Sequence, residues 1–121
     1  MMRESIRYFD LENNSIGCII YHRIVDADGN VIWDGRKGYP SSNSIHIGQH
    51  IVFDLSKVNE DGRLDGGKWL FLSSNTVSGN DYTEWNVSFI YDQSSSTIAT
   101  VSRTGTSYQG ELQFKGTRQK S

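Results

Sequence analysis

The chain alternates apolar and polar residues over short stretches, and this period of two is typical of β-strands with one buried face. After Glu84, the residues Trp85, Val87, Phe89 and Tyr91 fall on one face and polar residues fill most of the other. No stretch keeps a helical period over three turns, and a single helical turn is expected near 56–60. The pattern therefore predicts an all-β protein.

Turn-forming residues divide the chain into eight expected strands. They cover 5–11, 16–25, 31–34, 44–55, 68–73, 83–91, 97–103 and 107–114, with a bulge expected at Gly48. The Asp28-Gly29 pair supplies the positive φ that a tight hairpin turn needs, so 16–25 and 31–34 should form a hairpin.

Eight short strands with polar turns predict an antiparallel β-sandwich, formed by one domain over 1–121. No internal repeat or linker interrupts the chain. We expect the core to contain Phe53, Trp85, Phe89 and Phe114, because the alternation places their large rings on apolar faces.

Charge and composition exclude some classes of binding partner. The net charge is −2, from 12 basic and 14 acidic side chains, and no basic stripe suited to nucleic acid occurs. The basic residues Lys115, Arg118 and Lys120 are expected to form a solvated C-terminal end. The longest apolar run is too short to span a bilayer, so the monomer is not expected to cross a membrane.

Cysteine usage and the N-terminus bear on the compartment. Cys18 is the single cysteine and is flanked by apolar residues, which predicts a buried, inert thiol rather than a disulfide. The segment 1–5 has no apolar signal region. We expect synthesis in the cytoplasm, and release without a standard secretion signal is left open.

Metal and catalytic patterns are weak. In a strand, His46 and His50 would lie roughly 13 Å apart, too far to share one zinc ion. The segment 26–30 has the glycine spacing of a hairpin rather than of an EF-hand, and Asn59, Asp61 and Asp65 are typical of solvated turn residues, with calcium as the alternative. No nucleophile elbow or phosphate loop occurs. We therefore expect no cofactor, no metal and no enzymatic activity.

Aromatic residues beside polar ones in loops suggest a binding site. Tyrosine faces can stack on a sugar ring or an acyl boundary, while charged and amide groups bond hydroxyls or phosphate. Two loops combine these groups and are predicted to form the ligand site if they lie at the same end of the fold. The residues are Arg36, Tyr39, Asn80, Asp81 and Tyr82.

The segment R-E-S-I-R-Y-F-D-L-E-N-N-S-I-G at 3–17, followed by Asp28-Gly29 and Trp33, resembles the start of aegerolysin-like proteins. The resemblance also covers 47–53 and 89–92. It implies a small acidic β-sandwich that binds membrane lipid and acts with a larger pore-forming partner. After Asp92 the chain reads Q-S-S-S in place of the family's aromatic segment, so no site residue is carried over.

These observations predict a non-enzymatic module that binds a cell surface, through a lipid headgroup or a glycan, as a component of a toxin. A lectin-like protein that acts alone is one alternative. A structural subunit that forms homo-oligomers by pairing strand edges is the other.

Overall fold

The computed structural model describes residues 2–38 and 43–121, and strands dominate it. The prediction of an all-β protein is confirmed, and so is the helical turn expected near 56–60, which appears as two short 3-10 helices. The strands are β1 Met2–Ile6, β2 Tyr8–Ser15, β3 Ile20–Asp26, β4 Val31–Asp34, β5 His50–Asp54, β6 Leu70–Thr76, β7 Tyr82–Thr83, β8 Val87–Tyr91, β9 Thr97–Gly105 and β10 Gly110–Gln119. The helical turns are α1 Gly35–Gly38, η2 Leu55–Lys57 and η3 Asn59–Asp61.

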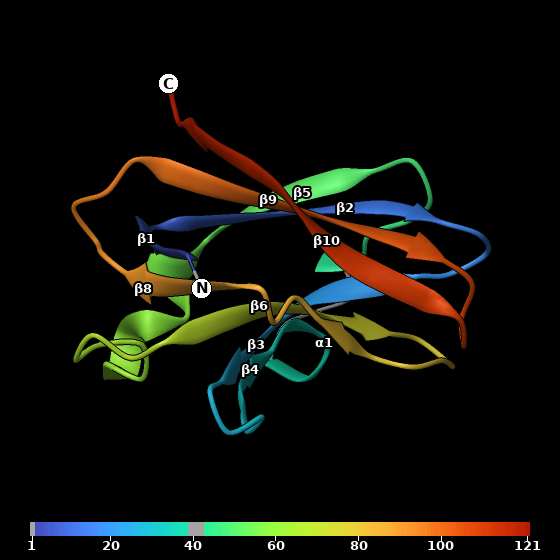
Figure 1. The fold of residues 1–121 in the computed structure, drawn as a ribbon, viewed down its shortest axis with the longest axis horizontal. Coiled ribbons are helices and arrows are strands. Elements are labelled where there is room, and N and C mark those ends of the chain that lie inside the picture. The colour runs from blue at the N-terminus through green and yellow to red at the C-terminus, as the bar shows by residue number, and fades with distance from the viewer. Residues whose placement is uncertain (1, 39–42) are drawn as a thin grey trace.

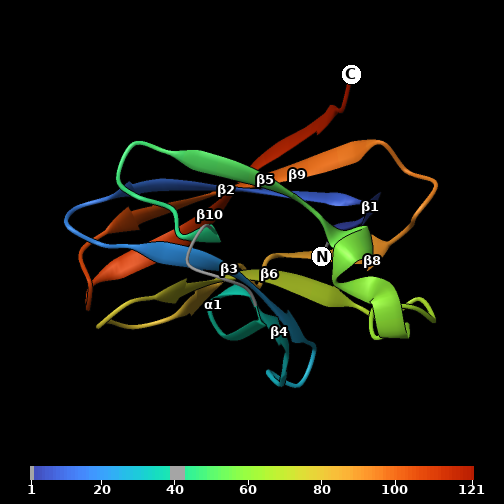
Figure 2. The same cartoon turned by 180° about the vertical axis from the view of Figure 1, so that it is seen from behind.

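Two sheets form two layers, as Figures 1 and 2 show from opposite sides. The six-stranded sheet has the order β1-β8-β6-β3-β4, with β7 paired to β6. The four-stranded sheet has the order β10-β9-β2-β5. The hairpin β3–β4 forms as predicted, and its turn is held by the Asp26 carboxylate, which accepts from Asp28 N and Asn30 N at 2.9 Å.

The expectation of purely antiparallel sheets is wrong, because each sheet contains one parallel pair. β1 runs parallel to β8, and β2 runs parallel to β9. The chain passes from one sheet to the other at Arg7, and it does so again between β8 and β9. These two crossings lie side by side, with Arg7 N donating to Thr97 O at 3.1 Å and Asp92 N donating to Ile6 O at 2.9 Å. Parallel partners are joined by long connections, so no hairpin signal announces them.

Several strand boundaries differ from those expected. The segment 5–11 is divided between β1 and β2 at Arg7. The segment 44–55 contains a turn at Gly48, where φ is 82°, in place of a bulge, and β5 begins only at His50. Ile45 makes an isolated bridge to Ile20 instead.

The C-terminal basic residues are exposed to solvent as expected, but the last strand extends further than predicted and includes two of them. β10 continues to Gln119 across a register shift between Phe114 and Gly116, so Lys115 and Arg118 belong to a strand. Arg118 Nη2 lies 3.0 Å from Asp10 Oδ2 on β2. The pairing with β9 decides this, since a strand edge can order residues that have no apolar period of their own.

The core takes side chains from both sheets. Ile6, Phe9, Leu11, Ile20, Ile24, Leu70, Leu72 and Phe89 are fully buried in one cluster with Phe53 and Val101. Complete burial of such a side chain is worth about 1.5–3 kcal/mol. Phe53 and Phe89 are in the core as predicted, and Phe114 is partly buried against it.

Trp85 is a correction, because 45% of its surface is exposed. Residues 85 and 86 form a turn ahead of β8, so the alternation of β8 does not extend back to Trp85. Its ring lies outside the core against Phe71, with the ring centroids 4.9 Å apart.

Candidate functional site

Four turns meet at one end of the molecule, on the right in Figure 1. They are 16–19 between β2 and β3, 46–49 before β5, 77–80 after β6 and 106–109 between β9 and β10. Main-chain hydrogen bonds tie them together: Ile16 N to Gly105 O at 2.7 Å, Gly48 N to Asn13 O at 2.8 Å, Val77 N to Ile19 O at 2.9 Å and Asn80 N to Ser107 O at 2.8 Å. We call these four segments the turn end.

The turn end contains no aspartate, glutamate, lysine or arginine. Its tips carry three exposed apolar or amphipathic side chains, Ile16 at 73%, Tyr108 at 66% and Ile47 at 55% exposure. These three side chains lie on three of the four turns of the turn end.

A buried cation stiffens the turn that carries Tyr108. Arg103 is fully buried and donates from Nη1 to Thr104 O and from Nη2 to Thr106 O, the latter at 2.7 Å. Its guanidinium carbon lies 4.6 Å from the centre of the Tyr82 ring, a cation–π distance. Gly110 is required beside it, since an added Cβ would meet the guanidinium group. The turn is therefore held from inside.

The structure separates the residues predicted to contact a ligand. Asn80 is exposed at the turn end and donates to Tyr108 O at 3.2 Å. Asp81 accepts from Thr76 N at 2.8 Å. Tyr82 is partly buried against the core, and its hydroxyl accepts from Gly110 N at 3.0 Å. Arg36 lies on α1 and its side chain is exposed. Tyr39 lies outside the described residues.

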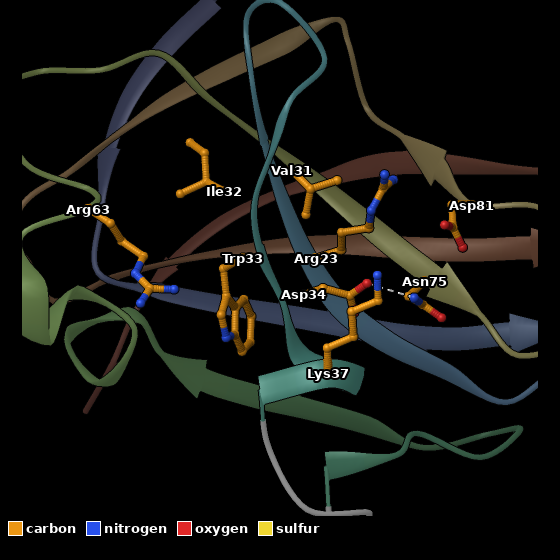
Figure 3. Close-up of a pocket in the computed structure, with 9 residues that line it drawn as sticks. All are labelled: Arg23, Val31, Ile32, Trp33, Asp34, Lys37, Arg63, Asn75 and Asp81. Carbon is orange, nitrogen blue, oxygen red and sulfur yellow. Dashed lines mark hydrogen bonds between the residues drawn. The ribbon is translucent and has the colours of Figure 1, made fainter.

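The two predicted loops do border one hollow on the outer face of the six-stranded sheet (Figure 3). Its volume is about 500 Å³, and Lys37 of α1 and Asp81 both line it. Arg36 and Tyr82 do not. The other lining residues are Arg23, Val31, Ile32, Trp33, Asp34, Arg63 and Asn75.

Hydrogen bonds fix the polar side of the hollow. Asp34 accepts from Asn75 Nδ2 at 2.9 Å and, like a helix N-cap, from Arg36 N at 3.0 Å. Arg23 Nη1 donates to Ser73 Oγ at 3.1 Å, and Ser73 Oγ in turn donates to Tyr82 O at 2.8 Å. These groups are therefore held in place before any ligand arrives.

The outer face of the four-stranded sheet has a different polar cluster. Asp10 is 1% exposed, and its carboxylate lies 2.9 Å from His50 Nδ1 and 3.0 Å from Arg118 Nη2. Thr100 accepts from Arg118 Nη1 at 2.7 Å. This cluster links β5, β2, β9 and β10, so it contributes to the pairing of these strands.

The histidines have separate environments. His22 is buried and donates from Nε2 to Ile51 O at 2.8 Å. Burial lowers the pKa of His22 to about 4, although its backbone hydrogen bonds oppose the shift. His46 and His50 lie in a turn and a strand respectively. Within residues 2–38 and 43–121, no group of three or more His, Cys, Asp or Glu side chains could hold a metal ion.

The opposite end of the molecule carries many charges. Its turns at 27–30, 55–69 and 92–96 contain acids and bases, several in local bonds. Arg63 Nη2 lies 2.8 Å from Asp61 Oδ2, and this hydrogen-bonded pair lowers the pKa of Asp61 to about 2. Asn59 donates to Asp65 at 2.8 Å, so the three residues weighed for calcium are held by hydrogen bonds. Cys18 is 2% exposed, as predicted.

Sequence reasoning missed Lys37, Arg23 and Asn75 in the hollow and Ile16 and Ile47 at the turn end. The turn end had a visible signal, since four uncharged turns are legible along the chain. The hollow had none, because its residues come from β3, β4, α1 and β6, and only the strand order brings them together.

No family model, no curated protein and no solved structure matches this chain. The resemblance to aegerolysin-like proteins therefore stays an expectation. In the part of the chain that the structure describes, no helix is long and apolar enough to cross a membrane.

Proposed function

We propose that the protein is a non-enzymatic β-sandwich module that docks on a lipid membrane through its turn end. The observation that carries this proposal is the gathering of Ile16, Ile47 and Tyr108 on turns without charged residues. The sequence predicts a module that binds a lipid or a glycan, and the turn end suits a lipid surface better.

The missing charges favour a bilayer over water as the environment of these tips. Moving an ionised side chain out of water costs a large desolvation free energy. The four turns contain no aspartate, glutamate, lysine or arginine, so docking on a bilayer would not involve this cost for such residues. Isoleucines can enter the acyl boundary, while a tyrosine keeps its hydroxyl among the headgroups. The tips therefore have the chemistry of an interfacial anchor.

The expected affinity is low and the docking reversible. An isoleucine that is 55–73% exposed can gain about 1–2 kcal/mol by burial. With Tyr108 the total is about 3–5 kcal/mol, which corresponds to a dissociation constant near 1 mM of lipid. Such an anchor holds a protein at a surface without embedding it.

A second copy of the chain fits these tips less well than a bilayer. A stable protein interface covers about 800 Å² on each partner. Three side chains of at most about 200 Å² each do not reach that area. They also project from separate turns, whereas a dimer needs a continuous complementary face.

Co-sedimentation with phosphatidylcholine vesicles tests the proposal, because these vesicles are zwitterionic and give no net electrostatic attraction. We expect the parent protein to sediment at millimolar lipid, and equally well in 0.5 M NaCl as in 0.1 M. The double variant Ile16→Ser/Ile47→Ser should bind at least tenfold more weakly.

Val31→Ser is the matched control, since Val31 is 47% exposed but lies on β4 away from the turn end. It should sediment like the parent. A parent protein that stays in solution at every lipid concentration, or a double variant that sediments unchanged, would show that the turn end does not dock on lipid.

A further inference from the structure

The hollow of Figure 3 has two chemically different sides. Ile32, Trp33 and Arg63 lie on one side of β4, and Val31, which is 47% exposed, lies on the other side. Arg23, Asp34, Lys37, Asn75 and Asp81 supply charged and amide groups to the other. A volume of about 500 Å³ lies within the range of small-molecule sites. A ligand that fills it needs both an apolar and a polar face.

The charges of the polar side cancel. Arg23 and Lys37 are balanced by Asp34 and Asp81, and Arg63 is paired with Asp61. Among the described residues, no ion pair within 4.0 Å involves any of the first four. The hollow thus offers cationic donors and anionic acceptors together, without an excess that would select a charged ligand.

The polar groups retain bonding capacity. Arg23 has five N–H donors and uses one of them on Ser73. Asp81 uses Oδ1 on Thr76 N, which leaves the capacity of its other oxygen. Because Arg23 and Asp81 are each anchored by at least one bond, little of their side-chain entropy is lost when a ligand binds.

Asn75 adds an unmet acceptor. The residue is 7% exposed, its Nδ2 donates to Asp34, and its Oδ1 is buried without a hydrogen-bond partner. A buried acceptor without a donor costs about 1–3 kcal/mol. Because Oδ1 is closed to solvent, Asn75 serves the hollow through its Nδ2, which holds the Asp34 carboxylate in place.

From these observations we infer that the hollow binds an uncharged sugar of one or two rings. Hydroxyl groups both donate and accept, which matches the mixed donors and acceptors. The C–H face of the ring packs on Val31, which lies on the same side of β4 as these polar groups. Sulfated or phosphorylated ligands gain no net attraction, because Asp34 and Asp81 offset Arg23 and Lys37. The hollow is separate from the turn end, so sugar binding can be tested independently of membrane docking.

A printed array of neutral and acidic oligosaccharides tests the inference, followed by calorimetric titration of the neutral sugars that bind. We expect the parent protein to bind a subset of neutral sugars. Lys37→Ala and Asp81→Asn should each weaken this binding at least fivefold, since each removes one charge from the polar side. Asp81→Asn keeps an acceptor for Thr76 N, so the turn is retained.

Matched controls carry the same changes elsewhere. Lys115→Ala lies on β10 in the other sheet, and Asp28→Asn lies in the β3–β4 turn. Both should bind sugar like the parent, and all four variants should sediment with phosphatidylcholine vesicles like the parent. Urea unfolding confirms that each variant is folded.

Three results would overturn the inference. They are an array that reports no sugar, an array that reports only sulfated, phosphorylated or carboxylated sugars, and folded Lys37→Ala and Asp81→Asn variants that bind neutral sugar as the parent does. Loss of vesicle binding by the Ile16→Ser/Ile47→Ser variant with sugar binding intact would leave the inference standing.

Discussion

The outer faces of the two sheets both carry charges of each sign, but they use them differently. On the four-stranded sheet, the buried carboxylate of Asp10 is shared by His50 and Arg118. On the six-stranded sheet, Arg23 and Asp34 are direct cross-strand partners, yet they form no ion pair. Asp34 bonds Asn75 and the α1 backbone, and Arg23 bonds Ser73.

If the hollow binds sugar as proposed, one fold divides its charges between stability and recognition. A charge bonded to a partner on a neighbouring strand supports the pairing of the strands and has little capacity left for a ligand. A charge bonded to neutral groups is held in position but keeps its electrostatic field for whatever enters the hollow. The four-stranded face is thus a structural surface, and the six-stranded face is suited to binding.

The largest expected effect is the pH dependence of the free energy of unfolding, which arises from His22 in the interior between the two sheets. The pKa of His22 is about 4 when folded and 6.5 in the reference state. Below pH 6.5 the unfolded chain takes up a proton that the folded chain does not, so stability is full above pH 6.5 and falls towards pH 4. The difference of 2.5 between these pKa values corresponds to about 3 kcal/mol.

Urea unfolding at pH 7 and pH 4 measures the loss, and His22→Gln should remove most of it because glutamine does not titrate. The carboxylates of Asp54 and Asp61, with a pKa of about 2, add their own losses only at lower pH. A parent protein equally stable at pH 7 and pH 4 would mean that His22 is not buried in neutral form.

Tyr82 offers a second way to break the comparison, because the sequence places it among the ligand contacts. Its ring packs under Arg103 and against the core, so Tyr82→Ala should lower the free energy of unfolding by about 2–3 kcal/mol. Tyr108→Ala is the matched control, and with 66% exposure it should change stability by less than about 0.5 kcal/mol. Equal melting temperatures for the two variants would show that the Tyr82 ring is not packed in the core.

Double-mutant cycles test the pairing of charges directly. The pair Asp10→Ala and Arg118→Ala should show a coupling of about 1 kcal/mol, reduced by the exposure of Arg118. The pair Asp34→Ala and Arg23→Ala should show a smaller coupling, about 0.2–0.5 kcal/mol, because the two residues are cross-strand neighbours that no ion pair joins. If the second coupling equals the first, the two faces do not differ in the way proposed.

The smallest expected effect separates Arg36 from its neighbour Lys37. The Arg36 side chain is exposed and does not line the hollow. Arg36→Ala should therefore change both stability and sugar affinity by less than about 0.5 kcal/mol, whereas Lys37→Ala should spare stability and weaken sugar binding. Calorimetric titration of the two variants measures their sugar affinity. A larger loss of affinity for Arg36→Ala than for Lys37→Ala would show that the charge that binds sugar lies outside the hollow.

The candidate site was partly legible along the chain. Two loops were predicted to hold ligand groups, and the hollow does lie between Lys37 and Asp81, which belong to those loops. The sequence did not distinguish Arg36 from Lys37, since the two are adjacent and no pattern tells which one lines the hollow. Asn75 and Arg23 were missed because they lie inside strands, where polar residues on an exposed face look ordinary.

The sequence by itself determined the all-β class, most strand positions, the β3–β4 hairpin, the burial of Cys18 and the core places of Phe53 and Phe89. These depend on period and on local turn chemistry, which act within a few residues. Tertiary structure decided the parallel pairs, the extension of β10, the exposed place of Trp85 and the contrast between Tyr82 and Tyr108. Those outcomes depend on which distant strands become neighbours, and a choice among distant partners is made by the energy of the whole fold.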